Sequence, residues 1–368
     1  MLKLFEFTKE QAISLIKKTD FDLSIKNQFI KDLDEKLYIK HTSFASNPML
    51  LNIMLLTYDN YAEIPEKMHL FYSNAFETLY SKHDATKGGF KRTLKSGLPL
   101  DSFRKIISKF CFITYYQCKL EFTYDDLIFY LKKSKINDVN YEVENIIYDL
   151  KNNICFLYED GVFYYFSHRS FQEYFTALFL KESSDETMQK MGLGLIENDS
   201  HRAVSDSVFD MLYDMSTDRF EQNIILPILE SIEKNTSSSK YDIYFNFIKP
   251  NVLFDEFDKP GEILLGLERN PDNITEFLKK ITFKYREKEP FENDKSDEKL
   301  LEYLKKYRNY SIGNDLKYTE IVEDDRLYSL LKNTWIGEYI KTMASIKDII
   351  IAKKNETELD LDSLLELV

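Results

Sequence analysis

The ten residues FSHRSFQEYF, from Phe166 to Phe175, mark the point where a β-hairpin is predicted to lead into a helix. Two β-rich runs precede the helix on either side of Asp160-Gly161. Asp-Gly between apolar runs is a strong hairpin signal. Phe171, Phe175 and Leu178 then recur at helical spacing, so one face of the following helix is predicted to be apolar.

Three amphipathic helices are predicted ahead of this hairpin, because apolar residues recur there at helical spacing. They are marked by Phe103, Ile106, Ile107 and Phe110, by Leu127, Ile128 and Leu131, and by Val143, Ile146, Ile147 and Leu150. Three helices followed by a hairpin is the element order of a winged helix. Residues 84–182 are therefore predicted to form a winged-helix domain with a small β-hairpin.

A bundle of short helices is predicted for residues 1–83. Thr8 and Gln11 have the spacing of a capping box. Asn47 fits an N-cap, and Pro48 fits the first helical position, where the missing N–H of proline costs nothing. The polar stretch 83–100, with its glycines and Pro99, is predicted to be a linker.

Residues 183–368 remain helical in pattern, without a signature motif or a fixed-period repeat. They are predicted to form an α-helical C-terminal region that acts as a sensor or interaction surface. The 10 glycines and 8 prolines of the 368 residues are few, which favours helices. The predicted fold class is mainly α: a helical bundle, a winged-helix domain with a small β-hairpin, and an α-helical C-terminal region.

The net charge of −13 argues against a nucleic-acid partner, because an acidic chain has no general attraction to phosphate backbones. Glu142, Glu144 and Asp149 in the predicted third helix, the usual groove reader, would also face phosphates unfavourably. A winged-helix DNA-binding regulator is therefore the least favoured function. This winged helix is predicted to be a packing and switching module.

Cysteine usage favours a cytoplasmic protein. Cys111, Cys118 and Cys155 form no C-x-x-C pair and are predicted to be buried apolar residues in a reducing compartment. The five histidines are scattered, so no metal site is predicted. No signal peptide is evident, and no apolar run reaches the ~18 residues of a transmembrane helix. No membrane partner is expected.

Motifs for catalysis are missing from the sequence. A P-loop would need G-x-x-x-x-G-K-[ST], but every Lys followed by Ser or Thr lacks the preceding glycine. No hydrolase motif occurs either. No catalytic residue, no metal and no cofactor is therefore predicted for this chain alone, and it is not expected to hydrolyse ATP by itself.

Three passages resemble the part of bacterial NACHT-type STAND NTPases that follows the P-loop core, namely the first helical domain, the winged helix and the following helical region. They are Ser46-Asn-Pro-Met-Leu-Leu-Asn-Ile-Met-Leu55, Ile64-Pro-Glu-Lys67 with Tyr72 and Leu79, and Phe166-x-His168-x-x-x-Gln172-Glu173-Tyr174-Phe175. The last is the most specific. The resemblance runs from about Phe5 to Lys181 and lacks the P-loop core.

The resemblance implies nucleotide-binding roles for two residues. Pro48 would pack against the adenine of ADP, and His168 would contact the ADP β-phosphate and hold the resting state closed. A histidine just before a helix N-terminus lies where anions are favoured, and its imidazole donates more strongly if protonated. From the residues alone, Pro48 is equally an ordinary helix-start proline, and His168 is a core histidine that caps the helix.

The neighbouring residues of the motif are predicted to have structural roles. Gln172 and Glu173 would satisfy nearby backbone groups or bridge to neighbouring helices. Phe171, Tyr174 and Phe175 recur at helical spacing and are predicted to be core residues.

Two functions follow from the resemblance. The first is the regulatory and sensing part of a STAND signalling ATPase in antiviral defence, with the core truncated, upstream or supplied elsewhere. ADP or ATP with Mg²⁺ would then be the cofactors of a nucleotide-dependent, ATP-hydrolysing switch. By analogy, its partners would be a protein ligand, such as a phage protein, and further copies of itself. The second is a stand-alone protein-interaction module that acts in trans on a related ATPase.

Overall fold

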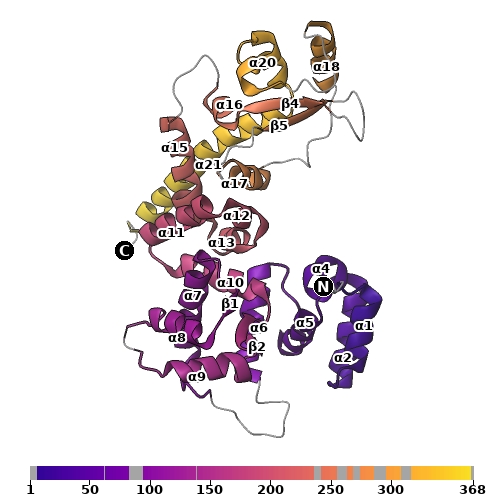
Figure 1. The fold of residues 1–368 in the computed structure, drawn as a ribbon, viewed down its shortest axis with the longest axis vertical. Helices are drawn as coiled ribbons and strands as arrows, with labels where there is room; N and C mark the ends of the chain where they lie inside the picture. The colour runs from indigo at the N-terminus through magenta and orange to yellow at the C-terminus, as the bar shows by residue number, and fades with distance from the viewer. Residues whose placement is uncertain are drawn as a thin grey trace. The chain divides into compact units, whose positions relative to one another are not determined.

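The structure is a computed structural model that describes residues 6–61, 63–82, 94–137, 139–235, 242–254, 263–267, 274–285, 296–307 and 316–365. It is mainly α-helical with two small antiparallel sheets, which confirms the predicted fold class (Figure 1). The chain forms two compact units. The first unit is Met1–Glu182 with Ser207–Met215, and the second is Ser183–Asp206 with Ser216–Val368.

The first unit begins with short helices, of which α1 and α5 start where the sequence predicts. They are α1 (Lys9–Lys18), α2 (Leu23–Asp32), the π-helical turn η1 (Leu33–Leu37), α3 (Tyr38–Lys40), α4 (Thr42–Ala45), α5 (Pro48–Tyr61) and α6 (Met68–Lys82). The predicted capping box is present, because Gln11 N–H donates to Thr8 Oγ1 and Thr8 N–H donates to Gln11 Oε1.

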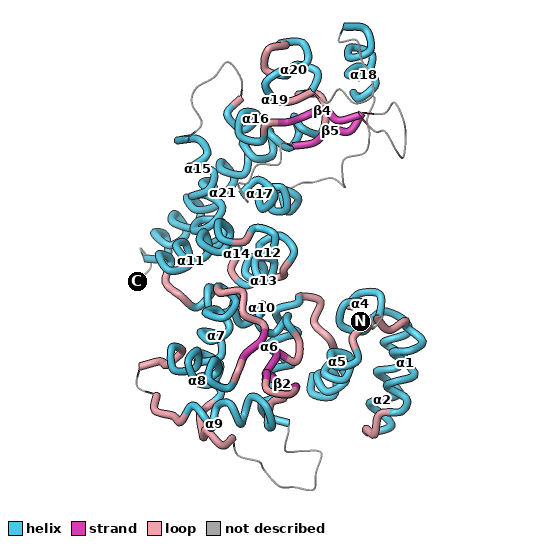
Figure 2. Tube along the Cα trace, viewed as in Figure 1, coloured by secondary structure: helices cyan, strands magenta, loops and turns pink. Residues whose placement is uncertain are grey.

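The remainder of the first unit has the topology of a winged helix. Its elements are α7 (Leu100–Tyr116), β1 (Glu121–Phe122), α8 (Tyr124–Lys133), α9 (Val143–Tyr148), the π-helical turn η2 (Asp149–Asn153), β2 (Leu157–Asp160), β3 (Phe163–Phe166), α10 (Arg169–Glu182) and α13 (Val208–Met215). The sheet order is β1-β3-β2, with all neighbours antiparallel. Figure 2 shows its strands in magenta among the helices.

The predicted hairpin is confirmed, and the sheet has one strand more than expected. Leu157 pairs with Phe166 and Asp160 with Phe163, so the chain reverses at Gly161. Gly161 has a φ of +64°, a conformation that glycine adopts without a steric penalty. The unpredicted strand β1 pairs through Glu121 with Tyr165. Two residues are too few to show an alternating pattern in the sequence.

A shared aromatic core joins the helical bundle to the winged helix. Phe76 on α6 packs edge-on against Phe175 on α10, with ring centroids 4.8 Å apart, and stacks near Phe103 on α7. All three rings are fully buried. Residues on both sides of position 83 therefore contribute to one core. The predicted linker residues 83–93 lie outside the described residues.

Helix α13 belongs to the first unit, although residues 207–215 fall within the predicted C-terminal region. It packs against α10 and α6. The Ser207 N–H at its start donates to Glu173 Oε2 over 3.0 Å. A carboxylate at this end stabilises the helix through its unpaired N–H groups.

Among its described residues, the second unit is helical apart from one β-ribbon, to which Leu316 adds an isolated bridge at Val252. It contains α11 (Asp185–Asn198), α12 (Ser200–Ser205), α14 (Thr217–Phe220), η3 (Glu221–Ile225), α15 (Leu226–Asn235), α16 (Ile243–Ile248), β4 (Pro250–Phe254), β5 (Ile263–Leu267), α17 (Ile274–Thr282), the 3₁₀ turn η4 (Phe283–Tyr285), α18 (Ser296–Tyr307), α19 (Tyr318–Ile321), α20 (Asp325–Leu331) and α21 (Trp335–Leu365).

The β4–β5 ribbon was not predicted from the sequence. Lys249 adopts a left-handed conformation with a φ of +42° and ends α16. Pro250 then cannot extend that helix, because it has no N–H, and it begins β4 instead. Leu253 pairs with Leu264 across the ribbon.

Over the ranges that the structure describes, none of the helices has the length and apolar character needed to cross a membrane.

Candidate functional site

The Phe166–Phe175 segment spans the junction between β3 and α10, as the sequence predicts. Phe166 is the buried last residue of β3, and Arg169 is the first residue of α10. His168 lies between them, and its carbonyl accepts a hydrogen bond from Phe171 N–H over 3.1 Å. The histidine thus occupies the N-terminal end of a 14-residue helix, where backbone N–H groups and the helix dipole favour anions.

The His168 imidazole is half-buried and is hydrogen-bonded through its Nδ1 atom. Ser170 N–H donates to His168 Nδ1 over 3.3 Å, and Ser170 Oγ is also hydrogen-bonded to Nδ1. Within the described part of the chain, no hydrogen bond engages His168 Nε2. Burial lowers the pKa of His168, so the neutral imidazole dominates at neutral pH. The sequence left open a protonated His168, which would be a stronger hydrogen-bond donor. Because the imidazole is neutral, protonation does not strengthen the donor here.

The prediction that Gln172 and Glu173 bridge to neighbouring segments is confirmed. Gln172 Nε2 donates to Thr114 Oγ1 over 3.0 Å and to the carbonyl of Lys119 over 3.1 Å. Glu173 holds the start of α13 through Ser207 and forms an ion pair with Arg169 at 3.4 Å. These contacts fix α10 against α7 and α13. Gln172 Oε1 is buried and has no hydrogen-bond partner among the described residues.

The aromatic residues of the motif are core residues, as predicted. Phe171, Tyr174 and Phe175 are all buried. Tyr174 stacks against Tyr72 of α6, and Phe175 packs against Phe156 beside the hairpin. Of the defined positions of the motif, His168 is therefore the one whose side chain is not buried.

Pro48 is the first residue of α5, and its side chain is exposed. Asn47 Oδ1 caps the helix by accepting from Met49 N–H at 2.9 Å and from Leu50 N–H at 3.1 Å. The helix-start role of Pro48 is therefore met by local structure. Its exposed ring is also accessible to a planar ligand, so its contact with adenine stays a prediction.

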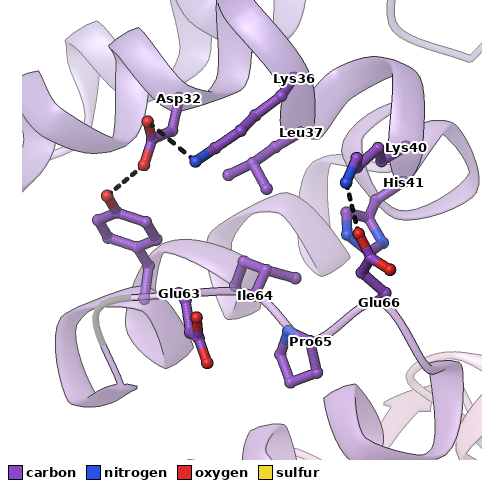
Figure 3. Close-up of a pocket in the computed structure, with 10 residues that line it drawn as sticks. Asp32, Lys36, Leu37, Lys40, His41, Glu63, Ile64, Pro65 and Glu66 are labelled. Atoms are coloured by element: carbon purple, nitrogen blue, oxygen red, sulfur yellow. Dashed lines mark hydrogen bonds and ion pairs between the residues drawn. The ribbon is translucent and has the colours of Figure 1, made fainter.

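A cavity of about 360 Å³ lies in the first unit, between the η1–α3 stretch and the chain that follows α5 (Figure 3). Its lining is formed by Asp32, Lys36, Leu37, Lys40, His41, Tyr58, Glu63, Ile64, Pro65 and Glu66. Lys36 is ion-paired with Asp32 at 3.6 Å, and Lys40 with Glu66. Charges of both signs thus neutralise each other around the opening.

His41 is the buried polar residue of this cavity wall, with 5% of its surface exposed. Its Nε2 is buried and has no hydrogen-bond partner among the residues that the structure describes. Burial, followed by the charge of Lys40, lowers the pKa of His41. Nothing in the sequence around His41 indicated this environment, because the cavity walls come from residues 32–41 and 58–66.

The face of the winged helix that would meet DNA differs in one respect from the sequence prediction. Glu142 and Glu144 are exposed, as expected. Asp149 is instead fully buried and accepts hydrogen bonds from the N–H groups of Lys95 and Ser96, both over 2.8 Å. The carboxylate anchors the segment ahead of α7, so it contributes no charge to the protein surface.

The cysteine prediction was right for Cys111, which is buried, and wrong for Cys118 and Cys155, which are exposed. Cys118 has a φ of +54° and Cys155 a φ of +55°. Both adopt a left-handed backbone conformation in connecting segments, one after α7 and the other before β2. Across the ranges described here, no three His, Cys, Asp or Glu side chains are grouped so as to hold a metal ion.

Comparison with known proteins does not extend these observations. No protein-family model matches the chain, and a search of curated proteins finds no match. Inferences about function therefore depend on the residues and geometry of the winged helix and of the β3–α10 junction.

Proposed function

We propose that this chain is the regulatory and sensing part of a NACHT-type STAND signalling ATPase, whose P-loop core is missing here or supplied elsewhere. One observation carries the proposal. The Phe166–Phe175 segment joins the hairpin of a winged helix to α10 and presents His168, with Nε2 uncommitted, at the helix N-terminus. The protein would be cytoplasmic and act in antiviral defence.

In this proposal His168 Nε2 donates a hydrogen bond to the β-phosphate of ADP and holds the resting state closed. The start of α10 favours an anion at that position. The exposed ring of Pro48 packs against adenine. The core would supply the phosphate-binding loop and Mg²⁺, and exchange of ADP for ATP would remove or rearrange the His168 contact. Such a switch works only because the two nucleotides make different contacts.

Nucleotide retention tests this proposal. The chain alone is expected to retain no ADP. A complex with its P-loop core is expected to co-purify with ADP, which acid releases for quantification by ion-exchange chromatography. In that complex His168→Ala is expected to weaken ADP binding about tenfold or more, since a hydrogen bond to a charged group contributes about 1.5–3 kcal/mol.

Exposed His201, on α12, provides the matched control. His201→Ala is expected to leave ADP retention at the level of the parent complex. Equal retention by His168→Ala and His201→Ala would refute the phosphate contact. Adding the chain to a separately purified core would show whether it also acts in trans, as a stand-alone module would.

The second unit is proposed to recognise a protein ligand, such as a phage protein, and to support self-association. This part of the proposal rests on the family resemblance, because the unit carries no motif of its own. The exposed carboxylates of Glu142 and Glu144 on α9 oppose a DNA-binding role.

A further inference from the structure

A chain of hydrogen bonds runs from the interior of the first unit to His168. Tyr72 O–H, on α6, donates to Ser170 Oγ, and Ser170 Oγ is bonded in turn to His168 Nδ1. We propose that Tyr72 and Ser170 are positioning residues that hold His168 in the tautomer with its proton on Nε2. The phosphate that this Nε2–H would meet rests on the proposed function, whereas the tautomer itself does not.

The backbone N–H of Ser170 is the first group that fixes the tautomer of His168. Ser170 N–H can only donate, and it points at His168 Nδ1 over 3.3 Å. A neutral imidazole carries one N–H and one lone pair, so the nitrogen that accepts must be the one without the proton. The proton of neutral His168 therefore resides on Nε2. The tautomer with the proton on Nδ1 would bring two N–H groups face to face.

The Ser170 hydroxyl adds a second donor to the same nitrogen. Tyr72 is buried, with 1% of its surface exposed, and burial raises the pKa of its hydroxyl. The phenol thus remains protonated and donates to Ser170 Oγ. Ser170 has one hydroxyl proton, and while its oxygen accepts from Tyr72 that proton is directed to His168 Nδ1.

Packing holds Tyr72 in place. Its ring lies edge-on to Phe44 and Phe171, with centroids 5.4 Å and 5.2 Å away, and it stacks on Tyr174 at 5.8 Å. A ring confined in this way cannot turn its hydroxyl elsewhere without disturbing the core. The buried hydroxyl also needs a partner, because leaving it unpaired costs free energy. Ser170 is that partner.

These hydrogen bonds hold His168 as a neutral imidazole that donates through Nε2–H. A neutral imidazole fixed as Nε2–H can donate to a phosphate oxygen without changing its protonation state. The orientation depends on α6 remaining packed against α10, since Tyr72 and Ser170 lie 98 residues apart in the sequence. The hydrogen-bond chain therefore links the His168 donor to the packing of these two helices.

Nitrogen-15 NMR of the full chain tests the proposal without any nucleotide. At a pH of about 8, above the usual titration range of histidine, the two ring nitrogens of each neutral imidazole are distinguished by their shifts. The His168 signals are assigned by their loss in His168→Gln. We expect Nε2 of His168 to carry the proton and Nδ1 to show the shift of an accepting nitrogen.

Three variants then examine the hydrogen-bond chain. Ser170→Ala is expected to lower the ratio of the Nε2–H to the Nδ1–H tautomer by about two- to tenfold, the effect of one ordinary hydrogen bond. Tyr72→Phe is expected to lower it in the same direction by a smaller factor. Ser170→Thr keeps the hydroxyl and is expected to restore the ratio of the parent chain.

Ser108→Ala is the matched control. Ser108 is also a buried serine, and its hydroxyl donates to the Arg104 carbonyl over 2.9 Å within α7. Its removal is expected to leave the His168 signals unchanged. A proton on His168 Nδ1 in the parent chain would overturn the proposal, as would Ser170→Ala and Tyr72→Phe spectra that match the parent.

The two proposals fail independently of each other. The expected tautomer together with undiminished ADP retention in His168→Ala would refute the phosphate contact and leave the positioning roles intact. Loss of ADP in His168→Ala together with a proton on Nδ1 would support the phosphate contact and refute the positioning roles.

Discussion

At the scale of single residues, a few buried polar groups hold the winged helix in shape. Asp149 is fully buried, and its carboxylate accepts from two backbone N–H groups ahead of α7 and from the side-chain amide of Asn153. On α10, Gln172 donates to the Lys119 carbonyl and Glu173 accepts from Ser207 N–H. Each of these side chains satisfies backbone groups that would otherwise lose their hydrogen bonds on burial.

Asp149→Ala is expected to destabilise the chain by about 2–4 kcal/mol, because it leaves the N–H groups of Lys95 and Ser96 without an acceptor. Urea unfolding followed by circular dichroism measures the loss. Glu142→Ala is the control, since Glu142 is exposed and its side chain makes no capping hydrogen bond to α9; a change within about 0.5 kcal/mol is expected. Equal stability of the two variants would contradict this role for Asp149.

At the scale of elements, helix α6 packs as part of the winged-helix core. Phe76 on α6 meets Phe103 on α7 and Phe175 on α10, and all three rings are buried. Pulling α6 away from α10 would expose these rings to water, at a cost of about 1.5–3 kcal/mol for each side chain. The proposed switching motion of the winged helix is therefore expected to carry α6 along with α10.

A double-mutant cycle between Phe76→Ala and Phe175→Ala tests this interface. Each single change is expected to destabilise the chain by about 3–5 kcal/mol, as large-to-small changes in a core do. The pair is expected to couple by about 0.5–1.5 kcal/mol, because the two rings meet edge to face. Phe129→Ala is the control, since Phe129 is 53% exposed. A coupling of zero would mean that the two rings are not in contact in solution.

At the scale of the whole molecule, buried histidines make stability depend on pH. Burial lowers the pKa values of His41, His69 and His168 from the ordinary 6.5. Below pH 6.5 the unfolded chain then binds more protons than the folded chain. The stability that these neutral histidines contribute is therefore fully present above pH 6.5, and it is lost as the pH falls through their pKa values in the folded chain.

The urea concentration at the midpoint of unfolding is expected to decrease as the pH is lowered from about 7.5 to about 5.5, a range above that in which most carboxylates titrate. His41→Gln removes one of the buried titrating groups and is expected to make this fall shallower. A midpoint that is constant over this range, or a slope in His41→Gln that agrees with the slope of the parent chain, would contradict the assignment.

The sequence by itself determined the local elements of this protein. The capping box at Thr8, the start of α5 at Asn47-Pro48 and the reversal at Gly161 all lie where the residues predict them. Caps, turns and helical spacing act over about four residues, so the local sequence contains the interactions that decide them.

Only the tertiary structure decided which distant residues meet. The pairing of β1 with β3, the burial of Asp149 beneath Lys95 and Ser96, and the return of α13 to the first unit depend on packing between segments far apart in the chain. The same holds for Tyr72, whose hydrogen bond to Ser170 has no signal in the sequence. The physical reason is that such contacts form only when several apolar faces are buried together, so no local pattern specifies them.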